Sequence, residues 1–149
     1  MAARDLHGMI IALTTWLADP TRANLILNPS GAQKREIFSH FLPDDATVAD
    51  TATVVRLGAG SPREYDPFER VGVQIMTRGK LLAPVMERSS VIYDELLDTH
   101  RRPLRHITLD ADWMLHIVNP APPQTVGHDE KRRPLAVINI NITAGLLPE

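Results

Sequence analysis

The chain has 149 residues, with 16 Lys and Arg against 18 Asp and Glu, 44% hydrophobic residues, 12 Pro and no Cys. A chain of this length can bury one hydrophobic core without needing a disulfide or a structural metal, so one domain is expected. The lack of Cys excludes disulfide scaffolds, Cys-ligated metal sites and thiol nucleophiles. The net charge of −2 argues against a protein whose main task is to neutralise nucleic-acid phosphate.

The apolar run over residues 9–13 is far shorter than the roughly 20 residues needed to span a bilayer. Asp5, His7 and Gly8 interrupt the lead-in that a signal peptide would need. We therefore expect no membrane segment, and a protein that stays in the cytoplasm where it is made.

The first third of the chain predicts one helix and one strand. Apolar residues recur at helical spacing from Leu6 to Leu17, and Asp19-Pro20 should end that helix. Residues 21–50 hold several turn-forming stretches around a short cluster of apolar residues at 37–42, and we expect an irregular connection with at most one short helix. Residues 51–57 are rich in β-branched side chains and predict a strand.

A second strand is predicted over residues 71–76, after a long excursion at 58–70. Apolar spacing then predicts a helix over 82–97, in which Pro84 is tolerable only in the first turn. Short strands are expected at 105–109 and 113–118, followed by a Pro-rich loop at 120–134. Ile138, Ile140 and Ile142 alternate strictly with polar residues and predict a last strand with one face in the core.

This order of elements lacks the rhythm of βαβ crossovers. It predicts a single α+β domain, 1–149, in which a mostly antiparallel sheet is covered by two helices. Residues 144–149 are expected to form a flexible C-terminal tail.

Residues with catalytic potential do not form a recognisable constellation. His100, His106, His116 and His128 lie near Asp110 and Asp112, but no pair has the spacing of a known metal motif. The serines Ser61, Ser89 and Ser90 lie outside any GxSxG elbow, and Gly58-Ala59-Gly60 has no helix behind it to cradle a phosphate. Asp44 and Asp45 sit in a turn context. We expect no catalytic, metal or cofactor site, and a small metal-dependent hydrolase that uses His106, His116 and Asp112 stays as an alternative.

Two basic clusters stand out, Arg101-Arg102 with Arg105, and Lys131-Arg132-Arg133. Nucleic-acid binding would favour aromatic platforms beside them, and only Tyr93 and Trp113 are candidates. Protein contacts are the favoured interpretation, and a nucleic-acid-binding accessory protein is a further alternative.

Four stretches, taken in order, carry a resemblance to a known family. They are Val73-Gln74-Ile75 with Arg78-Gly79, then Ile92-Tyr93 with Leu96, then the loop from Pro122 to Arg133, and finally the strand 138–142. This order resembles the small bacteriophage minor capsid or tail terminator proteins of long-tailed phages, prophages and gene-transfer particles. The likeness spans about residues 54–143.

The resemblance implies a structural protein of the virion and no enzyme or cofactor. Such proteins form a ring, usually hexameric, that caps the finished tail tube, stops its polymerisation and presents a surface to the head connector. The implied partners are other copies of the chain, the tail tube protein and the head–tail connector protein. DNA would at most pass through the ring lumen, and no membrane is involved. A connector ring on the other side of the joint is the nearest alternative.

Long loops suit heterologous ring contacts, so the loops 58–70 and 120–134 are the expected subunit and tube interface. The candidate residues are Arg63, Glu64, Asp66, Glu69, Arg70, Asp129, Glu130, Lys131, Arg132 and Arg133.

Overall fold

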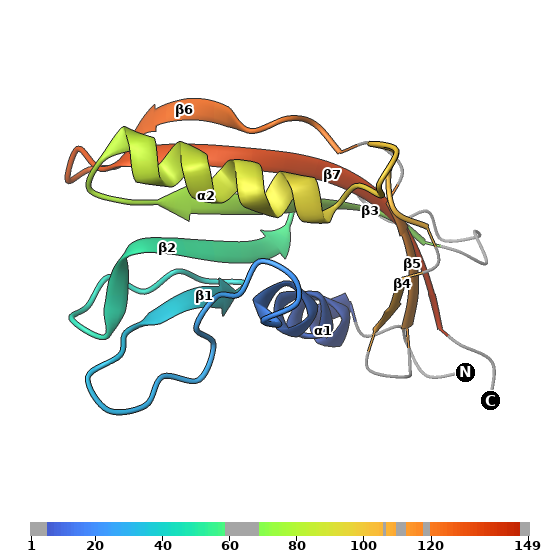
Figure 1. Cartoon of the computed structure of the whole chain (residues 1–149), viewed down its shortest axis with the longest axis horizontal. Helices are drawn as coiled ribbons and strands as arrows, with labels where there is room; N and C mark the ends of the chain where they lie inside the picture. Colours follow the sequence, from blue (N-terminus) through green and yellow to red (C-terminus); the bar gives the residue numbers. More distant parts are fainter. Residues whose placement is uncertain (1–5, 59–68, 106, 110–112, 118–119, 147–149) are drawn as a thin grey trace.

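A computed structural model describes residues 6–58, 69–105, 107–109, 113–117 and 120–146. Within these residues the chain forms two helices and seven strands (Figure 1). In chain order they are α1 (Leu6–Ala18), β1 (Arg35–Ser39), β2 (Val48–Leu57), β3 (Glu69–Arg78), α2 (Leu82–Glu95), β4 (Ile107–Leu109), β5 (Trp113–Ile117), β6 (Gln124–His128) and β7 (Pro134–Leu146).

The strands form one curled sheet in the order β1-β2-β3-β7-β5-β4. The long strand β7 pairs with β3 along one edge, and its other edge is shared by β5 near the C-terminus and by β6 near its start. β1 and β2 are parallel, and the remaining pairs are antiparallel. The expected single α+β domain with a mostly antiparallel sheet is therefore confirmed.

Both helices pack on the same face of the sheet (Figure 1). Alternation along each strand turns every second side chain toward them. Ile75 and Ile138 lie opposite each other in the β3–β7 register, and both belong to the main core together with Leu13 of α1 and Ile92 of α2. The alternation is confirmed over residues 138–142, because Asn139 and Asn141 are exposed between buried isoleucines, whereas Val137, expected on the exposed face, is buried.

The boundaries of both helices follow the predicted signals. α1 ends at Ala18, directly before Asp19-Pro20. α2 begins at Leu82 and places Pro84 in its first turn, where the missing N–H has no partner to lose.

The prediction of an irregular connection at 21–50 is wrong for residues 35–39, which form β1, and for residues 48–50, which begin β2. β1 has only five residues, and they include Arg35 and Glu36. Its strand conformation depends on parallel pairing with β2, where Phe38 lies beside Val54, rather than on local propensity. Such a long-range partner leaves no periodic signal in a short charged segment.

Two further predictions are corrected. The expected loop at 120–134 contains β6, which pairs antiparallel with the start of β7. The expected flexible tail at 144–149 is wrong for residues 144–146, because β7 continues to Leu146 by pairing with β5. Residues 147–149 lie outside the described residues.

Candidate interaction surface

The hairpin of β6 and β7 contains the candidate residues 129–133, and its turn is built around one carboxylate. Asp129 Oδ1 accepts the backbone N–H groups of Lys131 and Arg133, each at 2.9 Å. The N–H of Asp129 in turn donates to the Arg133 carbonyl at 3.0 Å, and Arg132 takes a left-handed φ of 60°. The turn is therefore a fixed structure.

Ion pairs tie this hairpin to the loop between β1 and β2. Asp44 contacts Lys131 Nζ at 2.7 Å and Arg133 Nη1 at 3.0 Å, while Arg133 Nη2 lies 2.7 Å from Asp129. Hydrogen bonds from Lys131 and Arg133 lower the pKa of Asp44 to about 2. Beside them, the buried Arg78 donates to the Pro43 carbonyl at 2.9 Å, so two segments distant in sequence are joined at the sheet.

These contacts divide the predicted interface residues into groups. Asp129, Lys131 and Arg133 are bonded within the subunit, whereas Glu130 and Arg132 are exposed and have no ion pair within the part of the chain that the structure describes. The first three charged residues thus stabilise the hairpin within the subunit, and the last two are exposed at its surface.

The other candidate loop is only partly described. Glu69 and Arg70 belong to β3 and pair with Ala144 and Thr143 of β7, which corrects their expected place in a loop. The remaining candidates of that loop, Arg63, Glu64 and Asp66, lie outside the described residues.

β6 is exposed along its whole length, on both faces. Val126 is half exposed, and Gly127 takes a φ of 90° at the irregularity in the β6–β7 register. A strand whose residues are all exposed beside its pairing partner offers backbone and side chains to another chain.

The second basic cluster repeats the same turn. Asp98 Oδ1 accepts the N–H groups of His100 and Arg102 at 2.8 and 3.0 Å, and Arg101 has a φ of 62°. Arg101 then reaches Asp94 at 2.6 Å. Both clusters of the form Asp-x-x-Arg-Arg are therefore capped turns, and the sequence spacing of Asp to Arg was the signal that could have identified them.

The sheet face away from the helices has an apolar end and a polar end. Phe38, Ala52 and Val54 form a second small core with Leu42 and Met76 packed against it. Next to this core, a polar row crosses three strands. Arg56 Nε donates to Gln74 Oε1 at 2.9 Å, and Gln74 Nε2 donates to Asn139 Oδ1 at 3.4 Å.

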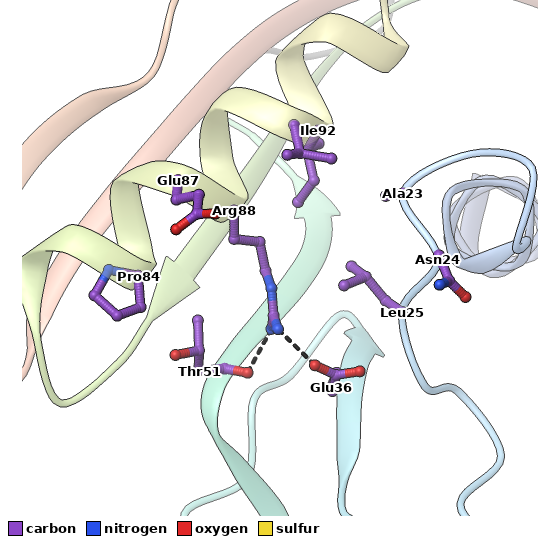
Figure 2. A pocket seen from close by; sticks show the side chains of 10 residues that line it. Ala23, Asn24, Leu25, Glu36, Thr51, Pro84, Glu87, Arg88 and Ile92 are labelled. Atoms are coloured by element: carbon purple, nitrogen blue, oxygen red, sulfur yellow. Dashed lines mark hydrogen bonds and ion pairs between the residues drawn. The ribbon is translucent and has the colours of Figure 1, made fainter.

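On the opposite side, a groove of about 310 Å³ lies between α2 and the segment 23–25 (Figure 2). Arg88 forms its floor by bridging Glu36, 2.5 Å away, and the Thr51 carbonyl. The contacts of Arg88 therefore join α2 to Glu36 in β1 and to Thr51 in β2. Glu36 also accepts the Ile26 N–H at 3.1 Å. No pattern in the sequence indicates the Arg88–Glu36 pair, because its members are 52 residues apart.

Only one of the hydrolase candidates lies within the described residues. His116 lies in β5, while His106, Asp110 and Asp112 lie outside the described part. Ser89 is buried in α2, and Asp44 is engaged in the ion pairs above. Over the described ranges, no group of three or more His, Asp or Glu side chains is placed to hold a metal ion.

The described part of the chain has no helix long and apolar enough to cross a membrane. The fold and surfaces thus define the chain as a small α+β domain with a fixed charged hairpin. A scan against models of known protein families finds no match, and a search of curated proteins finds no significant relative.

Proposed function

We propose that this protein is a structural virion assembly protein, a tail terminator that forms a ring on the tail tube and joins the tail to the head connector. The proposal rests on the resemblance of the four ordered stretches. The observation that supports it best is the β6–β7 hairpin, which comes from one of these stretches and is exposed on both faces of β6.

The construction of the hairpin suits an assembly surface. Its turn is held by Asp129 and fastened by Asp44, so it can meet a partner without first being ordered. Glu130 and Arg132 remain available for intermolecular contacts. Edge strands and fixed loops on one domain can supply the two different contact patches that a ring subunit requires.

Electron microscopy tests this function directly. Particles produced without the protein should carry overlong tails that lack heads, and the purified protein should form rings both in solution and on tube ends. Tails of normal length on the mutant particles would contradict the terminator function. Normal tails combined with unjoined heads would instead favour the connector ring.

A further inference from the structure

Phe41 is the most exposed large hydrophobic residue in the described part of the chain, at 72% of its surface. It belongs to the same apolar stretch as Ile37 and Phe38, which are both buried. Phe41 therefore does not contribute to the core. A single exposed apolar residue is common on protein surfaces, so its significance depends on how it is held.

The backbone before Phe41 is fixed in an unusual conformation. His40 has a φ of 67°, in a region that non-glycine residues seldom occupy. Its N–H donates to the Val55 carbonyl at 2.8 Å, and its ring stacks on the His7 ring with centroids 3.9 Å apart. The Phe41 N–H donates to the Ser39 carbonyl at 2.7 Å. Backbone strain maintained by surrounding contacts is typical of functional positions.

The groove beside α2 has the properties of a receptor for such a side chain. Pro84 and Val91 provide exposed apolar lining, and Leu25 and Ile92 lie behind them in the core. Arg88 is already bonded to Glu36 and to the Thr51 carbonyl (Figure 2). The groove volume of about 310 Å³ is ample, because a cavity of roughly 150 Å³ holds a benzene ring. Glu87 also lines the groove, is exposed and has no ion pair within the described residues.

The two features are chemically complementary. The exposed His7 imidazole stacks on His40, the chain neighbour of Phe41, and can donate an N–H to a carboxylate; the groove offers the Glu87 carboxylate beside its apolar lining. Phe41 and the groove are different patches of one chain, so their contact can repeat heterologously from copy to copy, and it forms a ring where the rotation between copies closes.

We infer that Phe41 of one copy enters the α2 groove of a second copy, with the His7–His40 pair against Glu87. This inference rests on the proposed ring and names the contact that would build it. It adds an interface distinct from the β6–β7 hairpin, which leaves the hairpin free for the tail tube or the connector.

The absence of Cys permits a clean test by intermolecular paramagnetic NMR. A nitroxide is attached to Ser90→Cys on the exposed side of α2, and this copy is mixed with a ¹⁵N-labelled copy that carries no nitroxide. The amides of residues 40–42 in the ¹⁵N copy should lose most of their intensity. A nitroxide at Thr125→Cys, on β6, is the matched control and should leave those amides unchanged.

Two variants of the ¹⁵N copy complete the test. Phe41→Ser should abolish the intensity loss without unfolding the chain, because Phe41 packs on no core, and Phe41→Trp should retain it. The inference is overturned if the Ser90 label affects residues 40–42 no more than the Thr125 label does, or if Phe41→Ser is broadened as strongly as the parent.

The NMR result and the tail length seen by electron microscopy can fail independently of each other. Intensity loss at residues 40–42 together with normal tails in particles lacking the protein would keep the contact and reject the terminator function. Overlong tails without the intensity loss would keep the function and reject this contact.

Discussion

At the scale of one residue, Gly79 explains how α2 can pack closely against the sheet directly after β3. A Cβ atom added to Gly79 would lie 2.7 Å from Val85 Cγ2 and 3.2 Å from Thr51 Oγ1. Val85 is fully buried in α2, so it has little freedom to move aside. The glycine thus permits α2 to approach β2 and β3 closely immediately after the strand.

Gly79→Ala should lower the free energy of unfolding by about 1–3 kcal/mol, the usual cost of overpacking a core. Urea denaturation of the purified protein measures this loss. Gly58→Ala is the matched control, since its nearest neighbours would lie at an ordinary 3.4 Å or more. Equal losses in the two variants would show that the close contact with Val85 is not the cause.

Asp44 gives a pH dependence whose sign follows from its ion pairs. Its pKa falls from an ordinary value of 3.8 to about 2 in the fold, because of the hydrogen bonds from Lys131 and Arg133. The stabilising effect is therefore complete above about pH 4 and is lost as the pH falls toward about 2. Asp44→Asn should make the decline in unfolding free energy over this interval shallower than in the parent.

Chemical denaturation at several pH values between 5 and 2 tests this expectation, at low salt where exposed charges are least screened (roughly 0.01 M). An unchanged slope in Asp44→Asn would mean that these ion pairs do not contribute to folding. The carboxyl resonance of Asp44 provides an independent titration of the same group.

At the scale of elements, the β6–β7 hairpin depends on Asp129 more than on its other charges. Asp129→Ala removes the acceptor for the Lys131 and Arg133 amides, so those amides and β6 should exchange hydrogen faster. The loss of local stability should be about 1 kcal/mol, a typical value for hydrogen bonds at a partly exposed turn. Hydrogen exchange followed residue by residue measures it.

Glu130→Ala is the neighbouring control, because its side chain has no ion pair within the described residues. It should leave the exchange of residues 124–134 at the parental rate. Similar acceleration in both variants would indicate that general loss of charge, and not the Asp129 cap, loosens the hairpin.

Elements differ in how well the sequence predicts them, and the reason is burial. β7 alternates buried isoleucines with exposed asparagines, so its period is visible in the chain. β6 is exposed on both faces and has no such period, although it forms a strand by pairing with β7. The sequence gives no clear signal for β1 either, because its strand conformation depends on a parallel neighbour that follows later in the chain.

The interaction surface shows the same division. The sequence identified the charged segment 129–133, but it could not show which of its charges are used internally. That distinction depends on Asp44, which is 89 residues away from Arg133 and meets it only in the folded sheet. Phe41 could be read only as part of an apolar stretch, since its exposure follows from the backbone at His40.

At the scale of the whole molecule, the two sides of the sheet carry different residues and different neighbours. Both helices cover one face, and the groove of Figure 2 lies beside α2 on that side. The opposite face carries the Arg56–Gln74–Asn139 row and the small core around Phe38. The two sides therefore offer different surfaces, and the proposed ring would use them in heterologous contacts.

The proposed ring makes a prediction that separates folding from assembly at two adjacent arginines. Arg133→Glu places a carboxylate beside Asp44 and Asp129, so it should destabilise the hairpin and lower the melting temperature. Arg132→Glu alters a side chain that has no ion pair within the described residues, and it should leave the melting temperature unchanged.

If the hairpin contacts the tube or the connector, Arg132→Glu should nevertheless impair ring formation on tube ends and the joining of tails to heads. Thermal unfolding followed by circular dichroism provides the first readout, and electron microscopy of particles made with each variant provides the second. Particles of normal tail length and normal joining with a folded Arg132→Glu protein would remove the hairpin tip from the interface. Because Arg133→Glu perturbs the subunit itself, its assembly defect alone would not identify a contact, and the comparison of the two variants supplies that distinction.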